Sequence, residues 1–424
     1  MNPHTFGNPK FSLTVTAIGA VLCLFASTCK AQSSDPEGNG IQISGFGTLG
    51  VVHLEAPVGW GFLRSIEQPP SKQSTRFDVD TRLGVQLNYA ASSQIELVSQ
   101  VLATRRRSDA PAGDAVEWAF AAYRPTADWT LRAGRLNLDQ FVMSDYRNVG
   151  FAYLYARPPV EYYATIPSNL DGADVTRTLS SDDARWRAKA FVGRSKTGGI
   201  PLTNAFGFAL TRESDGLLLR AGWSRAKLAH NSDGLTPLLD GLDQVRALPI
   251  PSVSAEAAAL RSGVDLAAKP VTFATLGMTY EQGPWQTAAE VTRIDIANSN
   301  VKAGYASIGR RIGAVTLFGM VSGSKSGASV MGPPAWGAVL APIIGPAAAQ
   351  QAQVLGATAA YVASQSTRQT TYSLGGRWDI HPRMALKVQW DHVQIKANGG
   401  FLWSNATSDP GSANIATVLL DFVF

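Results

Sequence analysis

Three features that mark many other protein classes are scarce in this sequence: cysteine, long apolar runs and net charge. Cysteine occurs twice, at Cys23 and Cys29, both within the first 31 residues. The chain after residue 31 therefore has no thiol and no disulfide, so its fold must rest on packing and backbone hydrogen bonds. No apolar stretch after residue 31 is long enough for a spanning helix, which excludes a helical membrane protein.

Charge and catalytic side chains exclude further classes. The formal net charge is +5, and it falls to +3 without Lys10 and Lys30 of the first 31 residues, so we expect no nucleic-acid partner. No phosphate loop or dinucleotide fingerprint is present. The remaining histidines lie far apart and none has metal-ligand spacing. We therefore expect no metal, no cofactor and no enzymatic activity. These histidines are His53, His230, His381 and His392.

The N-terminus has the pattern of an export signal. Residues 1–12 are polar with one base, an apolar run (FSLTVTAIGAVLCLFA) follows, and small residues lead to Ala31. We predict a signal peptide over 1–31, cleaved after Ala31, because the apolar run is at the short end for a membrane anchor. A short periplasmic segment, 32–40, would then precede a single domain over 41–424.

Apolar and polar residues alternate along most of that domain. From 77 to 89 the odd positions read Phe, Val, Thr, Leu, Val, Leu and Tyr, and the even positions are mostly charged or amide. Seven matches to a period of two predict a strand. In the last strand, Phe424, Phe422 and the alternate residues before them would meet lipid, whereas Asp421 and Thr417 would face a lumen.

The order of strands and connections predicts an all-β fold, a transmembrane antiparallel β-barrel of about sixteen strands, with fourteen or eighteen also compatible. Short and long connections alternate strictly, as the periplasmic and extracellular rims of a barrel require and a soluble sandwich does not. The strands are predicted to begin near Ile41, Ser74, Gln94, Val116, Trp129, Asp171, Ala184, Asn204, Gly216, Val271, Trp285, Lys302, Val315, Arg368, Arg383 and Ala413.

The export signal, the opening strand IQISGFGTLG, the strand number, a long third loop and the closing LLDFVF together resemble the Gram-negative porins, the trimeric outer-membrane diffusion channels. The resemblance spans the whole mature chain and is architectural. It implies an outer-membrane location, a homotrimer, contacts with lipid and lipopolysaccharide, and passage of small hydrophilic solutes. A terminal phenylalanine on such a strand resembles the signal read by the barrel-assembly machinery, which Phe422 and Phe424 would carry.

The same resemblance implies that the third loop, 136–170, folds into the barrel and narrows it. The loop is rich in aromatic residues, which a loop left in water has no reason to collect; packing on the rim or on a neighbouring protomer is the alternative. On the loop side of this constriction we expect Asp139, Asp145, Arg147, Arg157 and Glu161. On the wall side, in the polar phase of the strands, we expect Arg76, Arg82, Arg132, Arg185, Arg187, Arg377 and Lys387.

These charges admit two interpretations. Loop carboxylates facing wall guanidinium groups would set a transverse field across a narrow neck, and an excess of lumen arginines would favour anions. Alternatively, the charges pair locally or solvate a wide lumen. Outside the neck, the basic run 105–107 would attract anionic solutes or lipopolysaccharide phosphates, or remain a solvated loop.

Other stretches bear on the surfaces of the barrel. Two long loops are predicted to contain helices, one around Ala255–Leu260 and one in the alanine-rich stretch ending near Tyr361. We expect the second loop to pack as a lid; the alternatives are that it dips into the barrel, caps the mouth or touches a neighbour. Eight tryptophans are expected to form an interfacial girdle: Trp60, Trp118, Trp129, Trp186, Trp223, Trp285, Trp378 and Trp390.

The functional hypothesis is a passive diffusion channel for small hydrophilic solutes and ions, filtered by size and charge. One alternative is a channel selective for a class of anionic solutes such as carboxylates or sulfonates. Another is a non-conducting adhesin or receptor that acts through the long loops. An enzyme on the outer face would need a lipid-facing histidine beside a serine, and only His392 is in phase, without an identifiable partner.

Overall fold

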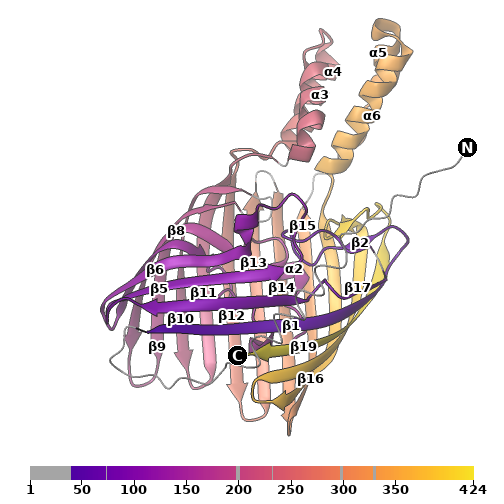
Figure 1. Ribbon diagram of the computed structural model, residues 1–424. Coiled ribbons are helices and arrows are strands. Elements are labelled where there is room, and N and C mark those ends of the chain that lie inside the picture. The colour runs from indigo at the N-terminus through magenta and orange to yellow at the C-terminus, as the bar shows by residue number, and fades with distance from the viewer. Residues whose placement is uncertain (1–39, 73, 197–200, 232, 297–298, 328–330) are drawn as a thin grey trace, which may run out of the picture.

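A computed structural model describes residues 40–424 except 73, 197–200, 232, 297–298 and 328–330. The predicted signal peptide lies outside the described residues. Sixteen long antiparallel strands form one closed sheet, in which each strand pairs with the next and the last pairs with the first (Figure 1). The strands are β1 (Ile41–Glu55), β4 (Arg82–Ala90), β5 (Ile95–Thr104), β6 (Val116–Thr126), β7 (Trp129–Asn137), β8 (Asn169–Ser180), β9 (Arg185–Ser195), β10 (Leu202–Ser214), β11 (Leu217–Leu228), β12 (Pro270–Gln282), β13 (Trp285–Ile296), β14 (Ser299–Ile312), β15 (Val315–Gly327), β16 (Thr367–His381), β17 (Met384–Gly400) and β19 (Gly411–Val423).

The predicted barrel and its strand number are confirmed, with one local difference. The strand predicted from Ser74 divides into a two-residue piece, β3 (Thr75–Arg76), and β4, and residues 77–81 leave the ladder between them. Phe77 is 71% exposed, whereas the Asp80 side chain turns inward and is buried among guanidinium groups. A buried carboxylate must be paired or hydrogen-bonded, and this requirement takes Asp80 out of the strand. The alternating pattern of the sequence does not indicate that departure.

Turns and long loops are sorted onto opposite rims, as the sequence predicts. Residues 215–216 join β10 to β11, and Asp215 and Gly216 both have positive φ, 44° and 78°, the type I′ geometry that an Asp-Gly pair favours. At the other rim, β2 (Gly61–Phe62) of the first loop pairs with β18 (Trp403–Ser404) of the last, which ties two distant loops together.

Side chains alternate between an apolar outer face and a polar lumen. In β19, Val418 is 41% exposed, whereas Thr417 and Asp421 are 1% and 0% exposed, which confirms the predicted phase. None of the helices in the described residues is both long and apolar enough to cross a bilayer. An outward apolar band on a closed antiparallel barrel places the chain in the outer membrane.

Of the eight tryptophans predicted to form a girdle, Trp129, Trp186, Trp285 and Trp378 lie at the rim of short turns. An arginine guanidinium lies 5.2–5.8 Å from the ring centroid in three places. The other four lie elsewhere: Trp60 is buried in the first loop, Trp118 faces Gln100 on the inward side, and Trp223 and Trp390 lie in the middle of β11 and β17. The arginine pairs are Trp129–Arg177, Trp186–Arg212 and Trp285–Arg310, and the exposed Trp378 lies at the same rim.

Four helices stand above the rim of long loops, outside the barrel (Figure 1). They confirm the two predicted helical stretches, and they pack on one another around a shared apolar core that includes Leu242, Ala257, Trp336 and Ala359. Trp336 also donates its indole N–H to Glu256 at 2.9 Å. The helices are α3 (Thr236–Arg246), α4 (Pro251–Val264), α5 (Trp336–Ile344) and α6 (Pro346–Ala363).

Barrel closure depends on a fit between two aromatic rings and two glycines. The rings of Phe422 and Phe424 stack with centroids 6.4 Å apart, and they occupy the space where a Cβ at Gly47 and Gly45 would lie. The backbones of Gly45 and Phe424 exchange hydrogen bonds of 2.8 and 2.9 Å. The seam between β1 and β19 therefore needs glycine on one side and an aromatic ring on the other.

We predict that Gly47→Ala weakens the seam, because the new methyl group would displace the Phe422 ring. Overpacking of this kind costs about 1–3 kcal/mol. The loss of the heat-modifiable folded band on heating in detergent measures it, and the variant should melt below the wild type. Gly113→Ala, where no atom lies within 4 Å of the new Cβ, is the matched control. Equal melting of Gly47→Ala and wild type would contradict the fit.

Candidate functional site

The interior of the barrel is crossed by the loop between β7 and β8, residues 138–168, called L3 from here on. It contains two short helical turns, η2 (Gly150–Ala152) and α2 (Val160–Tyr163). L3 makes side-chain contacts with strands far from its own ends, because Arg157 reaches Asp391 of β17 and Glu161 reaches Ser322 of β15. The loop therefore runs across the lumen.

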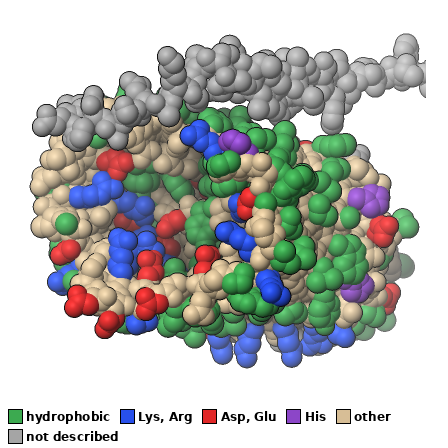
Figure 2. All heavy atoms as spheres, turned by 90° about the horizontal axis from the view of Figure 1, so that it is seen from below, with side chains coloured by type: hydrophobic (Ala, Val, Ile, Leu, Met, Phe, Trp, Pro, Cys, Tyr) green, Lys and Arg blue, Asp and Glu red, His purple; other side chains and the backbone are tan. Residues whose placement is uncertain are grey.

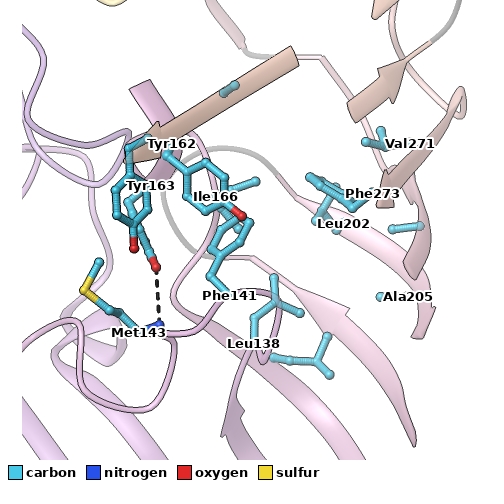
Figure 3. Packing of buried hydrophobic residues seen from close by; sticks show 14 of the residues in the cluster. Leu138, Phe141, Met143, Tyr162, Tyr163, Ile166, Leu202, Ala205, Val271 and Phe273 are labelled. Carbon is cyan, nitrogen blue, oxygen red and sulfur yellow. Dashed lines mark hydrogen bonds between the residues drawn. The ribbon is translucent and has the colours of Figure 1, made fainter. Parts of the chain in front are cut away.

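An aromatic cluster joins the beginning of L3 to its end. Phe141 packs against Tyr162 and Tyr163 with ring centroids 4.5 and 5.0 Å apart, and Ile166 and Leu138 lie beside them (Figure 3). The main-chain N–H of Met143 donates to the Tyr163 hydroxyl at 3.3 Å, the dashed line in Figure 3. The rings thus fold two separated segments of the loop onto each other.

A single buried carboxylate fastens this cluster to the wall. Glu290 of β13 accepts hydrogen bonds from the hydroxyls of Tyr163, Tyr162 and Tyr305, the latter two at 3.4 and 2.7 Å. It also accepts the main-chain N–H of Val142 at 2.9 Å. Four donors offset the desolvation of this carboxylate, so loop and wall are joined by polar contacts inside an apolar surround.

The second half of L3 is pinned by Arg157. Its guanidinium is 3% exposed and pairs with Asp80 at 2.9 Å and Asp391 at 3.0 Å. It also donates to the Thr417 hydroxyl and lies 5.5 Å from the ring centroid of Phe62. Two carboxylates from different parts of the wall therefore converge on one cation, which fixes both the position and the orientation of the loop.

Lys387 of β17 holds the middle of L3 through main-chain oxygens. Its ammonium, which has no exposed surface, donates to the carbonyl oxygens of Gly150, Tyr153 and Tyr155 at 2.6–2.9 Å. It also lies 3.0 Å from Asp421. The ammonium group thus replaces the backbone N–H donors that these three carbonyls lack in an irregular segment.

The remaining predicted residues on the loop side also have wall or loop partners. Asp139 pairs with Lys189 at 2.5 Å and with Arg220. Glu161 accepts hydrogen bonds from Ser322 at 2.7 Å and from Gln369 and Thr371. Arg147 donates to Glu67 of the first loop and to the Ile166 carbonyl, both at 3.3 Å, and Asp145 accepts from Asn137.

Of the predicted wall residues, Arg82 and Arg377 contact L3 as Lys387 does, whereas Arg132 pairs within the wall. Arg82 donates to the Tyr153 hydroxyl at 2.8 Å. Arg377 donates to the carbonyls of Phe151 and Tyr153 at 2.7 and 3.1 Å. Arg132 pairs with Asp174 on the neighbouring strand, 2.5 Å away.

The other three predicted wall residues face partners on the wall. Arg76 pairs with Asp78 near the long-loop rim. Arg185 is exposed at the start of β9, opposite Glu213 and Ser180. Arg187 is half-buried and faces Thr178 and Thr211 on the adjoining strands. They line the wall above or below the loop contacts.

The arrangement changes the electrostatic interpretation of the neck. Asp139 of L3 touches the wall cations Lys189 and Arg220, and Arg157 of L3 touches Asp80 and Asp391, so these charges do not face each other across an open gap. Between L3 and strands β12–β16 a polar cavity of about 260 Å³ remains, lined by both signs of charge, including Glu281, Arg311, Arg377 and Asp379. Viewed from the short-turn rim, basic and acidic side chains gather in the hollow of the barrel (Figure 2).

Several residues that hold L3 are not among the predicted constriction residues. Asp80, Asp391 and Asp421 lie in the polar phase of their predicted strands, which was a usable signal. Glu290 and Lys189 had the same signal, but nothing in a strand pattern tells a loop anchor from any other lumen residue. Among the described residues no group of three or more His, Cys, Asp or Glu side chains is placed to hold a metal ion.

No protein-family model and no curated protein sequence matches this chain. Several solved structures are similar to it in fold. OmpF of Salmonella typhi in complex with daunomycin has 12% identity and a TM-score of 0.51, covering 92% of this chain and 99% of its own. An anion-selective porin from Comamonas acidovorans has 10% identity and a TM-score of 0.51, covering 91% and 99%. The outer-membrane channel DcaP of Acinetobacter baumannii has 9% identity and a TM-score of 0.52, covering 92% and 99%. The chain thus has the porin-type barrel fold.

We predict that Arg157→Ala loosens the part of L3 around residue 157. Removing one partner from a buried ion pair costs about 3–5 kcal/mol, here because Asp80 and Asp391 lose their shared cation. In planar bilayers the variant should conduct more than wild type and with larger current noise. Arg107→Ala, which removes an exposed arginine paired with Asp109 alone, should leave the conductance unchanged. A quiet Arg157→Ala channel of wild-type conductance would contradict the anchoring role.

The same anchor has a defined pH dependence. Burial alone would raise the pKa of Asp80, but the guanidinium groups of Arg157 and Arg64 outweigh burial and lower the pKa to about 2, from 3.8. Because the folded-state pKa is the lower one, the contribution of Asp80 to stability is complete above about 3.8 and is lost as the pH falls through about 2. Current noise should thus stay constant from neutral pH down to about pH 4. Asp80→Asn should be noisy at neutral pH, and a noise transition of the wild type near pH 6 would contradict this assignment.

Proposed function

We propose that the protein is an outer-membrane diffusion pore through which small hydrophilic solutes and ions pass without an energy source. The observation that carries this proposal is the crossing of the lumen by L3 and its attachment to the wall on several sides. Arg157, Lys387 and Glu290 hold the loop at three separate places. A loop fixed in this way sets a constant aperture, as a size filter requires.

The contacts of L3 support a narrow and restrictive neck. Aromatic rings and paired charges fill much of the cross-section beside the loop, and the polar cavity of about 260 Å³ is large enough for ions and small solutes together with water. Passage is controlled by the predicted constriction residues indirectly, because Asp139, Arg157 and Glu161 set where the loop lies.

Charge pairing supports weak ion selectivity. Asp139 is balanced by Lys189 and Arg220, and Arg157 by two carboxylates, so the charged groups of the neck nearly cancel. Because these arginines are paired with carboxylates, the number of lumen arginines alone does not support the predicted preference for anions. We propose a pore that discriminates mainly by size, with at most a small preference for one sign of charge.

Single-channel recording of the full mature protein in a planar bilayer tests the function. We expect discrete steps with linear current–voltage behaviour and a reversal potential close to zero across a gradient of potassium chloride. Block that saturates with one carboxylate or sulfonate would favour the substrate-selective alternative. Absence of current from correctly folded, heat-modifiable protein would contradict the pore itself.

One structural feature favours a second candidate function, that of an adhesin or receptor. The helices α3–α6 form a separate packed unit beyond the rim, with Val339, Ile343 and Val354 exposed on it. Such a projecting unit presents a surface to other molecules outside the cell. Deleting its core contacts by Leu242→Ala should leave conductance intact if the pore is the function, whereas an adhesin would lose its binding partner.

We also propose that the protein forms a homotrimer and that Phe422 and Phe424 serve the assembly machinery. The resemblance of the whole chain to trimeric porins supports the first proposal, and the role of both rings in the seam gives the second a physical reason. Light scattering of the detergent-solubilised protein measures the oligomeric state.

A further inference from the structure

A row of basic side chains crosses the outer face of the barrel near the rim of long loops. Arg293 of β13 lies directly opposite Lys302 of β14, Lys302 opposite Lys325 of β15, and Lys325 opposite Arg368 of β16. All four side chains are exposed and occupy the outward phase of their strands. They form one continuous line of cations across four adjacent strands.

This row is unfavourable in the absence of a ligand. Side chains directly opposite each other in antiparallel strands lie about 4.5–5.5 Å apart at Cβ, and like charges so placed repel. Arg293 pairs with Asp295 at 2.9 Å, whereas Lys302, Lys325 and Arg368 have no ion-pair partner among the described residues. The sequence between Asp295 and Asp379 contains no acidic residue that could serve as one.

An apolar groove lies directly below the cations. The backbones of Gly304 and Gly323 pair with each other two positions below Lys302 and Lys325, and their missing side chains hollow the surface. The groove has a volume of about 790 Å³, and Val291, Leu276 and Trp223 line it together with three of the four cations. Charge at one end and apolar walls below it match an amphiphile with an anionic head.

The position of the four cations along the membrane normal matches the level of the lipid headgroups. Trp285 and Arg310, which pair at the short-turn rim, lie eight positions from Arg293 and Lys302 along the same two strands. Eight residues span about 27 Å along a strand, or about 20 Å across the membrane at a typical barrel tilt. That is close to the apolar band of about 25 Å in such barrels, so the cations lie at the outer headgroup level.

We propose that Arg293, Lys302, Lys325 and Arg368 bind the phosphate groups of an outer-leaflet lipid, whose acyl chain lies in the groove over Gly304 and Gly323. The bound phosphates neutralise the row and remove the repulsion between adjacent strands. The basic run 105–107 is a poorer candidate, because Arg105 and Arg107 already pair with Asp78 and Asp109. The proposal depends on the membrane location of the barrel and is independent of conductance.

Native mass spectrometry of the full mature protein in detergent, titrated with bis-phosphorylated lipid A, tests the site. We expect Lys302→Gln/Lys325→Gln to bind lipid A roughly 10- to 30-fold more weakly than wild type, from the usual contribution of a basic residue at an anionic membrane surface. The matched control, Arg177→Gln/Arg310→Gln, removes the same charge from the short-turn rim and should bind within about twofold of wild type.

Two further probes separate the sources of the phosphate. Dephosphorylated lipid A should bind as weakly to wild type as lipid A binds to the variant, and inorganic phosphate should not compete with lipid A. Filling the groove by Gly323→Leu should weaken lipid A and leave the four cations in place. Equal binding of lipid A by wild type and the Lys302→Gln/Lys325→Gln variant overturns the proposal. So does full competition by inorganic phosphate, or a loss of oligomeric state in that variant, which would assign the row to a contact between copies.

Discussion

Every part of this molecule depends on the closed ladder of backbone hydrogen bonds, because a lipid environment offers no water to an open strand edge. The last pair of strands, β1 and β19, completes that ladder with ten paired residues from Phe46 to Glu55. Phe422 and Phe424 lie over Gly47 and Gly45 at this seam, so the packing of these four residues supports the backbone pairing that closes the sheet. Once the sheet is closed, each strand has one face in lipid and one in the lumen, and the rest of the structure is arranged by that division.

Within the lumen, polar contacts fix the loop on the wall, as apolar packing fixes the elements of a soluble protein. L3 carries aromatic rings, but its attachment to the wall runs through Glu290, Arg157 and Lys387, each with several partners from the other side. A buried ionic contact of this kind is stabilising only when all its members are present. The neck is consequently a fixed element whose geometry depends on a small number of side chains.

The sequence was sufficient to predict the fold, but it predicted only some of the contacts between L3 and the barrel wall. Period-two alternation located the strands because one face must be apolar in lipid, and the strand predicted to begin near Lys302 is β14, which begins at Ser299. The same pattern failed at 77–81, where Asp80 leaves the ladder to meet Arg157, and at Trp118, which faces inward. Alternation reports which face a residue occupies. It contains no information on which residues from distant strands meet across a lumen, so Glu290 and Asp391 could not be recognised as anchors.

The packing of α3–α6 has a consequence for how the outer loops vary between related chains. Leu242 and Ala257 come from one loop and Trp336 and Ala359 from another, and each loop covers the apolar surface of the other. Shortening either loop alone would leave the remaining hairpin with an uncovered apolar face in water. The two loops should therefore change together in evolution. A change that alters the packing face of one loop requires a matching change in the other, although the loops lie almost a hundred residues apart in the sequence.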